Sequence, residues 1–164
     1  MAPMRIHSPS FAAAATLTAL ALVGCSKAAS SLAEVSAHHH HPPHGGTPVV
    51  LGDEQFHLEL VLDAPTGTLQ AYVLDAEMEN FVRSPAPSIE IAATVNGGER
   101  ILVLSAVANP MTGETVGDTS LFQVRADWLK SAASFDAVLR SIPIRGTTFS
   151  GVRFNYPKGN DTDG

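Results

Sequence analysis

Histidine is concentrated in one short segment of this chain. The sequence contains seven His. Five of them lie in the stretch HHHHPPHGG, at positions His38, His39, His40, His41 and His44. Neutral imidazole is the commonest metal ligand in proteins and suits Zn, Cu and Ni. The segment therefore predicts a site for a divalent transition metal (Zn²⁺, Cu²⁺ or Ni²⁺), with a solvated linker as the alternative.

A further His stands two residues before an acid in the stretch FHLELVLD. Apolar and polar residues alternate through this stretch with period two, which indicates a half-buried strand. If the apolar set faces the core, His57 and Glu59 share the outward face. Gly45 and Gly46 would allow His44 to fold back over this pair. The expected result is a His, His, Glu set with room for water, and the alternative is an exposed His beside an exposed Glu.

The N-terminus has the pattern of an export signal. Arg5 precedes an apolar run over residues 11–24, FAAAATLTALALVG, which has about the length of a signal-peptide h-region. The run is shorter than the ~20 apolar residues that a membrane-spanning helix needs. It ends in LVGC, which resembles the lipobox of bacterial lipoproteins. The resemblance implies that Cys25 receives a diacylglycerol and acyl chains such as palmitate, and that residues 1–24 are removed.

That lipoprotein resemblance also implies a location. Ser26 follows the Cys, whereas an Asp at that position often marks inner-membrane retention in the family. We therefore expect a lipid-anchored protein of the bacterial cell envelope, on the periplasmic side of the outer membrane rather than the inner one. Several acyl chains attach a protein stably, because each buried CH₂ contributes ~0.8 kcal/mol.

Composition excludes several classes of function. Removal of residues 1–24 takes away one Arg and no acid, so the formal charge goes from −6 to −7. No basic run is present, which argues against a nucleic-acid partner. Cys25 is the only cysteine, so no intrachain disulfide can form. The chain also lacks the Gly-x-Ser-x-Gly, His-Glu-x-x-His and P-loop patterns, and we predict that it is not an enzyme.

Short strands separated by turn residues dominate the rest of the sequence. We predict strands over residues 56–63, 68–75, 88–94, 100–107, 121–125, 137–144 and 147–156. Asn96-Gly97 predicts a tight hairpin, and residues 126–134 predict a short helical turn with Trp128. This pattern is typical of an all-β fold, an antiparallel β-sandwich of immunoglobulin-like size. A small closed barrel is the alternative.

The organisation along the chain follows from these patterns. We predict a lipoprotein signal peptide over residues 1–24 and a lipidated, flexible His-rich tether over residues 25–46. The β-sandwich domain is expected over residues 47–157. Residues 158–164, KGNDTDG, are polar and predict a disordered tail.

The region from the His tract to the second predicted strand resembles a known family segment. HPPHGG, VVLGDEQFHLELVLD and GTLQAYVLD are similar to the His-rich N-terminal segments of some periplasmic adaptor subunits of heavy-metal efflux pumps. The resemblance covers about residues 38–75. It implies periplasmic metal handling through His44, Gly45, Gly46, His57 and Glu59. The long helical hairpin and lipoyl-like parts of such adaptors are absent from this chain.

These observations lead to two expectations about function. The first is a lipoprotein that binds a divalent transition metal for buffering, for sensing or for delivery to an efflux component. The second is a non-enzymatic envelope module that binds another envelope protein. In that case the contact surface would be the loop over residues 108–119, which is rich in Asn, Pro, Gly and Thr.

Overall fold

A computed structural model describes residues 41–161, which form eight strands and one short 3-10 helix. The strands are β1 (Thr47–Leu51), β2 (Phe56–Asp63), β3 (Thr68–Asp75), β4 (Ser88–Val95), β5 (Gly98–Ala106), β6 (Leu121–Arg125), β7 (Phe135–Ile144) and β8 (Thr147–Tyr156). The helix η1 (Asp127–Ser131) carries Trp128, as the sequence predicts. The seven predicted strands are present, with ends within two residues of the predicted bounds.

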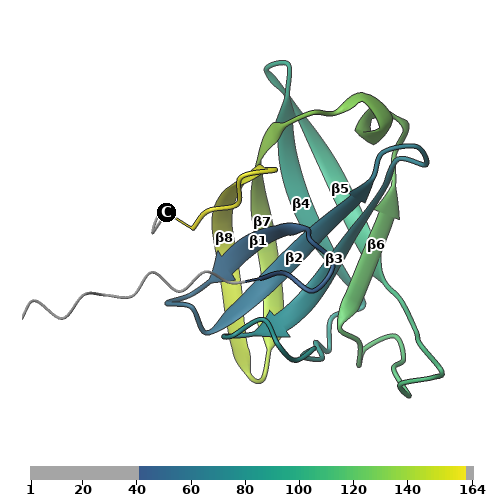
Figure 1. Cartoon of the computed structure of the whole chain (residues 1–164), viewed down its shortest axis with the longest axis vertical. Helices are drawn as coiled ribbons and strands as arrows, with labels where there is room; N and C mark the ends of the chain where they lie inside the picture. Colours follow the sequence, from purple (N-terminus) through teal and green to yellow (C-terminus); the bar gives the residue numbers. More distant parts are fainter. Residues whose placement is uncertain (1–40, 162–164) are drawn as a thin grey trace, which may run out of the picture. The chain divides into compact units, whose positions relative to one another are not determined.

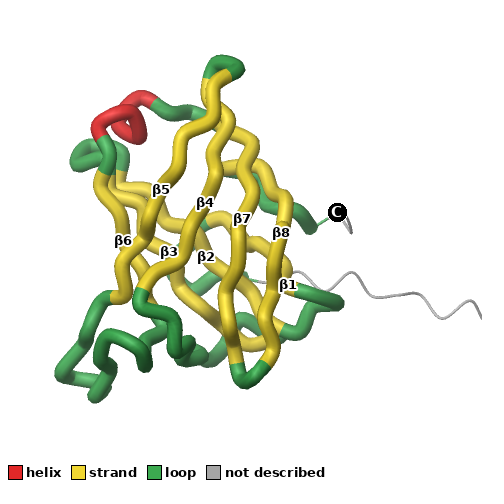
Figure 2. The backbone as a smooth tube through the Cα atoms, turned by 180° about the vertical axis from the view of Figure 1, so that it is seen from behind, coloured by secondary structure: helices red, strands yellow, loops and turns green. Residues whose placement is uncertain are grey.

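All strands belong to one antiparallel sheet, in the order β1-β2-β3-β6-β5-β4-β7-β8. Figure 1 shows β1, β2 and β3 crossing in front of β4, β5 and β7, so the sheet curls back on itself. Figure 2 shows the same two halves from behind. The predicted all-β antiparallel fold is confirmed. The two halves face each other as sandwich layers do, but they remain one nearly barrel-shaped sheet.

The main core lies between these two halves. Leu58 and Leu60 of β2 are buried there, together with Leu69 and Val73 of β3 and Phe122 of β6. The alternation that predicted β2 therefore identified its core face correctly. At the tip of the β4–β5 hairpin, Asn96 and Gly97 both have positive φ (50° and 77°). Two such residues make the turn that matches the twist of a hairpin.

The residues after β8 return to the first strand and extend the ordered domain beyond the predicted boundary at 157. The side-chain amide of Asn160 accepts a hydrogen bond from Val50 N–H (2.7 Å) and donates one to Val50 O (3.1 Å). The hydroxyl of Thr47 donates to Pro157 O at 3.1 Å. Residues 158–161 are thus held against β1, whereas their polar composition predicts a disordered tail. The prediction is wrong for these four residues because composition does not reveal this pairing with β1.

Candidate functional site

Glu59 lies at the centre of the candidate site, and its side chain has no exposed surface. One carboxylate oxygen accepts the backbone N–H groups of His44 (2.7 Å) and Gly46 (2.9 Å). The other oxygen is 2.8 Å from Nδ1 of His44. His44 therefore folds back over Glu59 through the two glycines, as predicted. Glu59 is nevertheless buried and not exposed, and residues 44–46 are held against β2 and are not part of the predicted flexible tether. A buried carboxylate needs such donors, since an unpaired buried charge is very costly.

The two glycines of the His-Gly-Gly sequence allow this close approach. A Cβ atom on Gly46 would lie 2.6 Å from Leu60 O and 2.8 Å from Cγ of Glu59, so no other residue fits without movement. Gly45 has a φ of +67°, in the left-handed region that glycine adopts at no steric cost. Its N–H donates to Pro42 O at 3.0 Å, which closes the turn.

His44 is fixed on two sides by this arrangement. Its ring stacks on Tyr72 of β3, with ring centroids 4.0 Å apart and an interplanar angle of 17°. The ring of Phe81 lies 5.9 Å away. Some 36% of the His44 side-chain surface remains exposed. Burial, and then the negative charge of nearby Glu59, raises the pKa of the Tyr72 hydroxyl above 10.0.

The contact with Glu59 determines which nitrogen of His44 holds the proton. An ionised carboxylate only accepts hydrogen bonds, so Nδ1 must be the donor. In the neutral ring, Nε2 is then the nitrogen with a free lone pair. The contact with Glu59 thus orients the His44 imidazole and leaves the lone pair of the neutral ring on Nε2.

His57 does not join this arrangement. Its side chain lies on the same face of β2 as Glu59, but it is fully buried and not exposed as predicted. Its Nδ1 is 3.2 Å from Asp75 O. Within residues 41–161, no three His, Cys, Asp or Glu side chains gather closely enough to hold a metal ion. The predicted His44, His57, Glu59 ligand set is therefore not assembled.

Of the other predicted site residues, only one lies in the part of the chain that the structure describes. His41 is exposed at the start of the described chain. His38, His39, His40 and Cys25 lie outside the described residues. Tyr72 and Phe81 were not predicted as site residues, although Tyr72 lies within the stretch GTLQAYVLD that resembles the adaptor segments.

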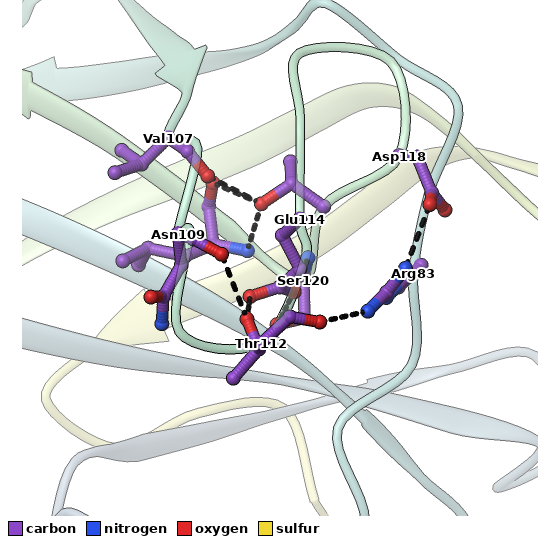
Figure 3. A network of polar contacts seen from close by, with 9 residues as sticks. Arg83, Val107, Asn109, Thr112, Glu114, Asp118 and Ser120 are labelled. Carbon is purple, nitrogen blue, oxygen red and sulfur yellow. Dashed lines mark hydrogen bonds and ion pairs between the residues drawn. The ribbon is translucent and has the colours of Figure 1, made fainter.

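A second polar cluster, also missed, fixes the long loop between β5 and β6 (Figure 3). Glu114 is buried there, and it accepts hydrogen bonds from the backbone N–H and hydroxyl of Ser120 (2.8 and 2.6 Å) and from the Thr112 hydroxyl (2.7 Å). Burial by itself would raise the pKa of Glu114. The hydrogen bonds from Ser120 and Thr112 and the charge of Arg83 outweigh it, so that the pKa lies below its ordinary value of 4.5.

Comparisons with known proteins found no relative of this chain. No family model, no curated protein and no solved structure matches the chain significantly. Within residues 41–161, the structure has no helix with the length and apolar character needed to span a bilayer. Function must therefore be argued from the site itself.

Proposed function

We propose that this protein is a lipid-anchored envelope protein that binds a divalent transition metal, with His44 as the ligand that the domain orients. The supporting observation is the 2.8 Å contact between Nδ1 of His44 and the buried carboxylate of Glu59. Metal-ligating histidines usually donate their other ring N–H to a carboxylate or carbonyl, which fixes the tautomer and raises ligand basicity. Glu59 is a positioning residue in this proposal and not a ligand.

The other ligands come from the same tract. His41 is exposed three residues before His44, and His38, His39 and His40 precede it directly. An imidazole site suits Zn²⁺, Cu²⁺ and Ni²⁺, with Cu²⁺ expected to bind most tightly. The role is binding, as a buffer, a sensor or a donor to an efflux component, and not catalysis. Because histidine ligands must be neutral, affinity should fall on acidification.

Calorimetric titration tests the proposal on the chain without residues 1–25. Zn²⁺, Cu²⁺ and Ni²⁺ are titrated into the wild type, into His44→Ala and into the matched control His41→Ala. If His44 is the oriented ligand, His44→Ala should weaken binding by about tenfold or more, and His41→Ala should weaken it clearly less. Equal losses of affinity in the two variants would mean that His44 is not an oriented ligand and that the His tract chelates metal without a defined structure.

Glu59→Gln separates orientation from ligation. The Gln amide NH₂ would donate to Nδ1 of His44, which moves the ring proton to Nε2 and blocks the metal-binding nitrogen. We expect affinity to fall by about 10–100-fold, the usual effect of losing an outer-shell carboxylate. Long-range ¹H–¹⁵N NMR of the His44 ring should report the change of tautomer directly. An unchanged tautomer with unchanged affinity contradicts the role given to Glu59.

The lipid anchor is a separate part of the proposal and has its own test. Two or more acyl chains on Cys25 should keep the protein in the detergent phase after phase separation. Cys25→Ser should move it to the aqueous phase. Mass spectrometry of the N-terminal peptide should find a diacylglycerol thioether on Cys25, and an unmodified thiol would exclude the anchor.

A further inference from the structure

Exposed hydrophobic side chains gather on two loops at one end of the sheet. Five large hydrophobic residues of the described chain are exposed. Three of them lie on these loops: Phe81 (51% exposed) between β3 and β4, and Met111 (93%) and Val116 (63%) between β5 and β6. Figures 1 and 2 show both loops at the same end of the sheet. Exposed apolar groups that gather in this way mark interaction sites more often than scattered ones do.

The two loops are joined to each other and are well fixed. Ser84 and Thr119 exchange two backbone hydrogen bonds (2.8 and 3.2 Å). The guanidinium of Arg83 donates to the Asp118 carboxylate at 2.8 Å and to Thr112 O at 2.6 Å (Figure 3). A partner that binds here would have little loop entropy to remove, so more of the contact energy would appear as affinity.

The loops enclose a cavity with an acidic surround. An open cavity of about 310 Å³ is lined by Asn80, Phe81, Arg83, Thr112, Glu114 and Ser120. Segments 75–85 and 108–120 together contain five acids and one Arg. That Arg is already paired with Asp118, whereas Glu77 and Glu79 are exposed beside Phe81. Phe81 is thus the one apolar residue of the cavity lining, and the exposed acids Glu77 and Glu79 precede it on the same loop.

We propose that this surface, defined by Phe81, Met111 and Val116 with Glu77 and Glu79, binds a protein segment that presents an apolar side chain next to Lys or Arg. Charge complementarity identifies the partner, because unlike charges around an apolar contact speed association and exclude acidic partners. The same negative charge disfavours an anionic lipid surface. This surface adjoins the proposed metal ligand, since the Phe81 ring lies 5.9 Å from the His44 ring, so the test below is run in chelator to keep metal out of the measurement.

Fluorescence anisotropy with the full-length chain in detergent and chelator tests the proposal. The probe is a labelled peptide of alternating Lys and Leu, and its controls are alternating Glu and Leu and alternating Lys and Ser. The chain is used as wild type, Phe81→Ser and Met111→Ser. Ile101→Ser is the matched control, since Ile101 is 47% exposed on β5.

The proposal expects only the Lys and Leu peptide to bind. Phe81→Ser should weaken its binding by about tenfold or more, as loss of a central aromatic anchor does, and Met111→Ser should weaken it less. Ile101→Ser should leave binding unchanged. Because Met111 is almost fully exposed, its substitution tests the surface even if Phe81→Ser disturbs the fold.

Charge is tested by a second pair of variants. Glu77→Gln with Glu79→Gln should weaken binding several-fold and reduce its dependence on salt. Glu54→Gln with Glu90→Gln removes two exposed acids elsewhere and should change neither. Three results would overturn the proposal: equal binding of the acidic peptide, equal loss with Ile101→Ser, or, for the chain without residues 1–25 in the absence of detergent, Phe81-dependent binding to phosphatidylglycerol vesicles instead of the peptide.

Discussion

Glu59 is an ionisable side chain without solvent exposure, and its burial is tolerated because three donors surround it. Two backbone N–H groups and one imidazole N–H satisfy its two oxygens. Removing one partner of such a group costs more than the pair contributes, since the remaining polar atoms stay buried without a partner. The His-Gly-Gly and His-x-Glu elements of the sequence are thus two halves of one structural unit.

Glu59→Ala should destabilise the domain by about 2–3 kcal/mol, because the N–H groups of His44 and Gly46 lose their acceptor. The measurement is the free energy of unfolding in urea. The control is Glu90→Ala, which removes an exposed acid from β4 and should change the free energy of unfolding by less than about 0.5 kcal/mol. A small effect of Glu59→Ala would mean that water replaces the carboxylate, and that the segment is not held by it.

Gly46→Ala should be more harmful than Gly45→Ala, although the two glycines are adjacent. The methyl group that Gly46→Ala adds would overlap Leu60 O and Cγ of Glu59, and such overpacking costs about 1–3 kcal/mol. Gly45 has open space around it, so only its left-handed backbone is penalised, by about 1 kcal/mol. Urea unfolding of both variants gives the comparison. The reverse order would show that residues 44–46 do not lie against β2 in solution.

At the scale of elements, periodicity predicted the strands but not what covers them. The alternation in β2 placed Leu58 and Leu60 in the core correctly. The two glycines indicated that His44 could fold back over Glu59, but alternation could not show that His57 and Glu59 are fully buried beneath their neighbours. β1 was missed because it is short and begins with Thr47-Pro48, which gives little alternation. That Tyr72 and Phe81 would pack against His44 was beyond the reach of these local patterns.

The loop between β5 and β6 shows the same limit. Asn, Pro, Gly and Thr predict a surface loop, and the loop is indeed largely exposed. Its internal order depends on Glu114, whose partners Thr112 and Ser120 carry no sequence signal that separates them from other polar loop residues. A fixed loop and a mobile loop can have the same composition.

Glu114→Gln should destabilise the domain by about 1–2 kcal/mol at pH 7, because the charged acceptor of three hydrogen bonds is lost. The folded-state pKa of Glu114 is lowered, so its contribution is complete above the ordinary value of 4.5 and is lost as the pH falls through the folded pKa. The difference in unfolding free energy between wild type and variant should therefore narrow below pH 4.5. A difference that is constant from pH 7 to the acid limit contradicts this assignment.

At the scale of the whole molecule, the two ends of the sheet are joined, because the residues that follow β8 form hydrogen bonds with β1. β1 and β8 are the terminal strands of the sheet, and an exposed strand edge invites pairing with other chains. The segment after Tyr156 covers part of the β1 edge with a side-chain amide in place of a strand. β1 in turn pairs with β2, with Thr47 opposite Leu60, and residues 44–46 directly precede β1.

Asn160→Ala should increase local opening at the β1 edge, while the free energy of global unfolding falls only modestly. The variant loses both hydrogen bonds to Val50, which contribute about 1–2 kcal/mol together. Hydrogen exchange should accelerate first at Val50, whose amide hydrogen would lose its acceptor, while β5 and β6 in the middle of the sheet stay protected. Lys158→Ala is the control, since Lys158 is exposed on the same segment. If Val50 keeps its protection in Asn160→Ala, the contact between Thr47 and Pro157 suffices to hold the edge. If exchange also accelerates at the backbone N–H groups of His44 and Gly46, the closure of the sheet and the orientation of His44 are coupled.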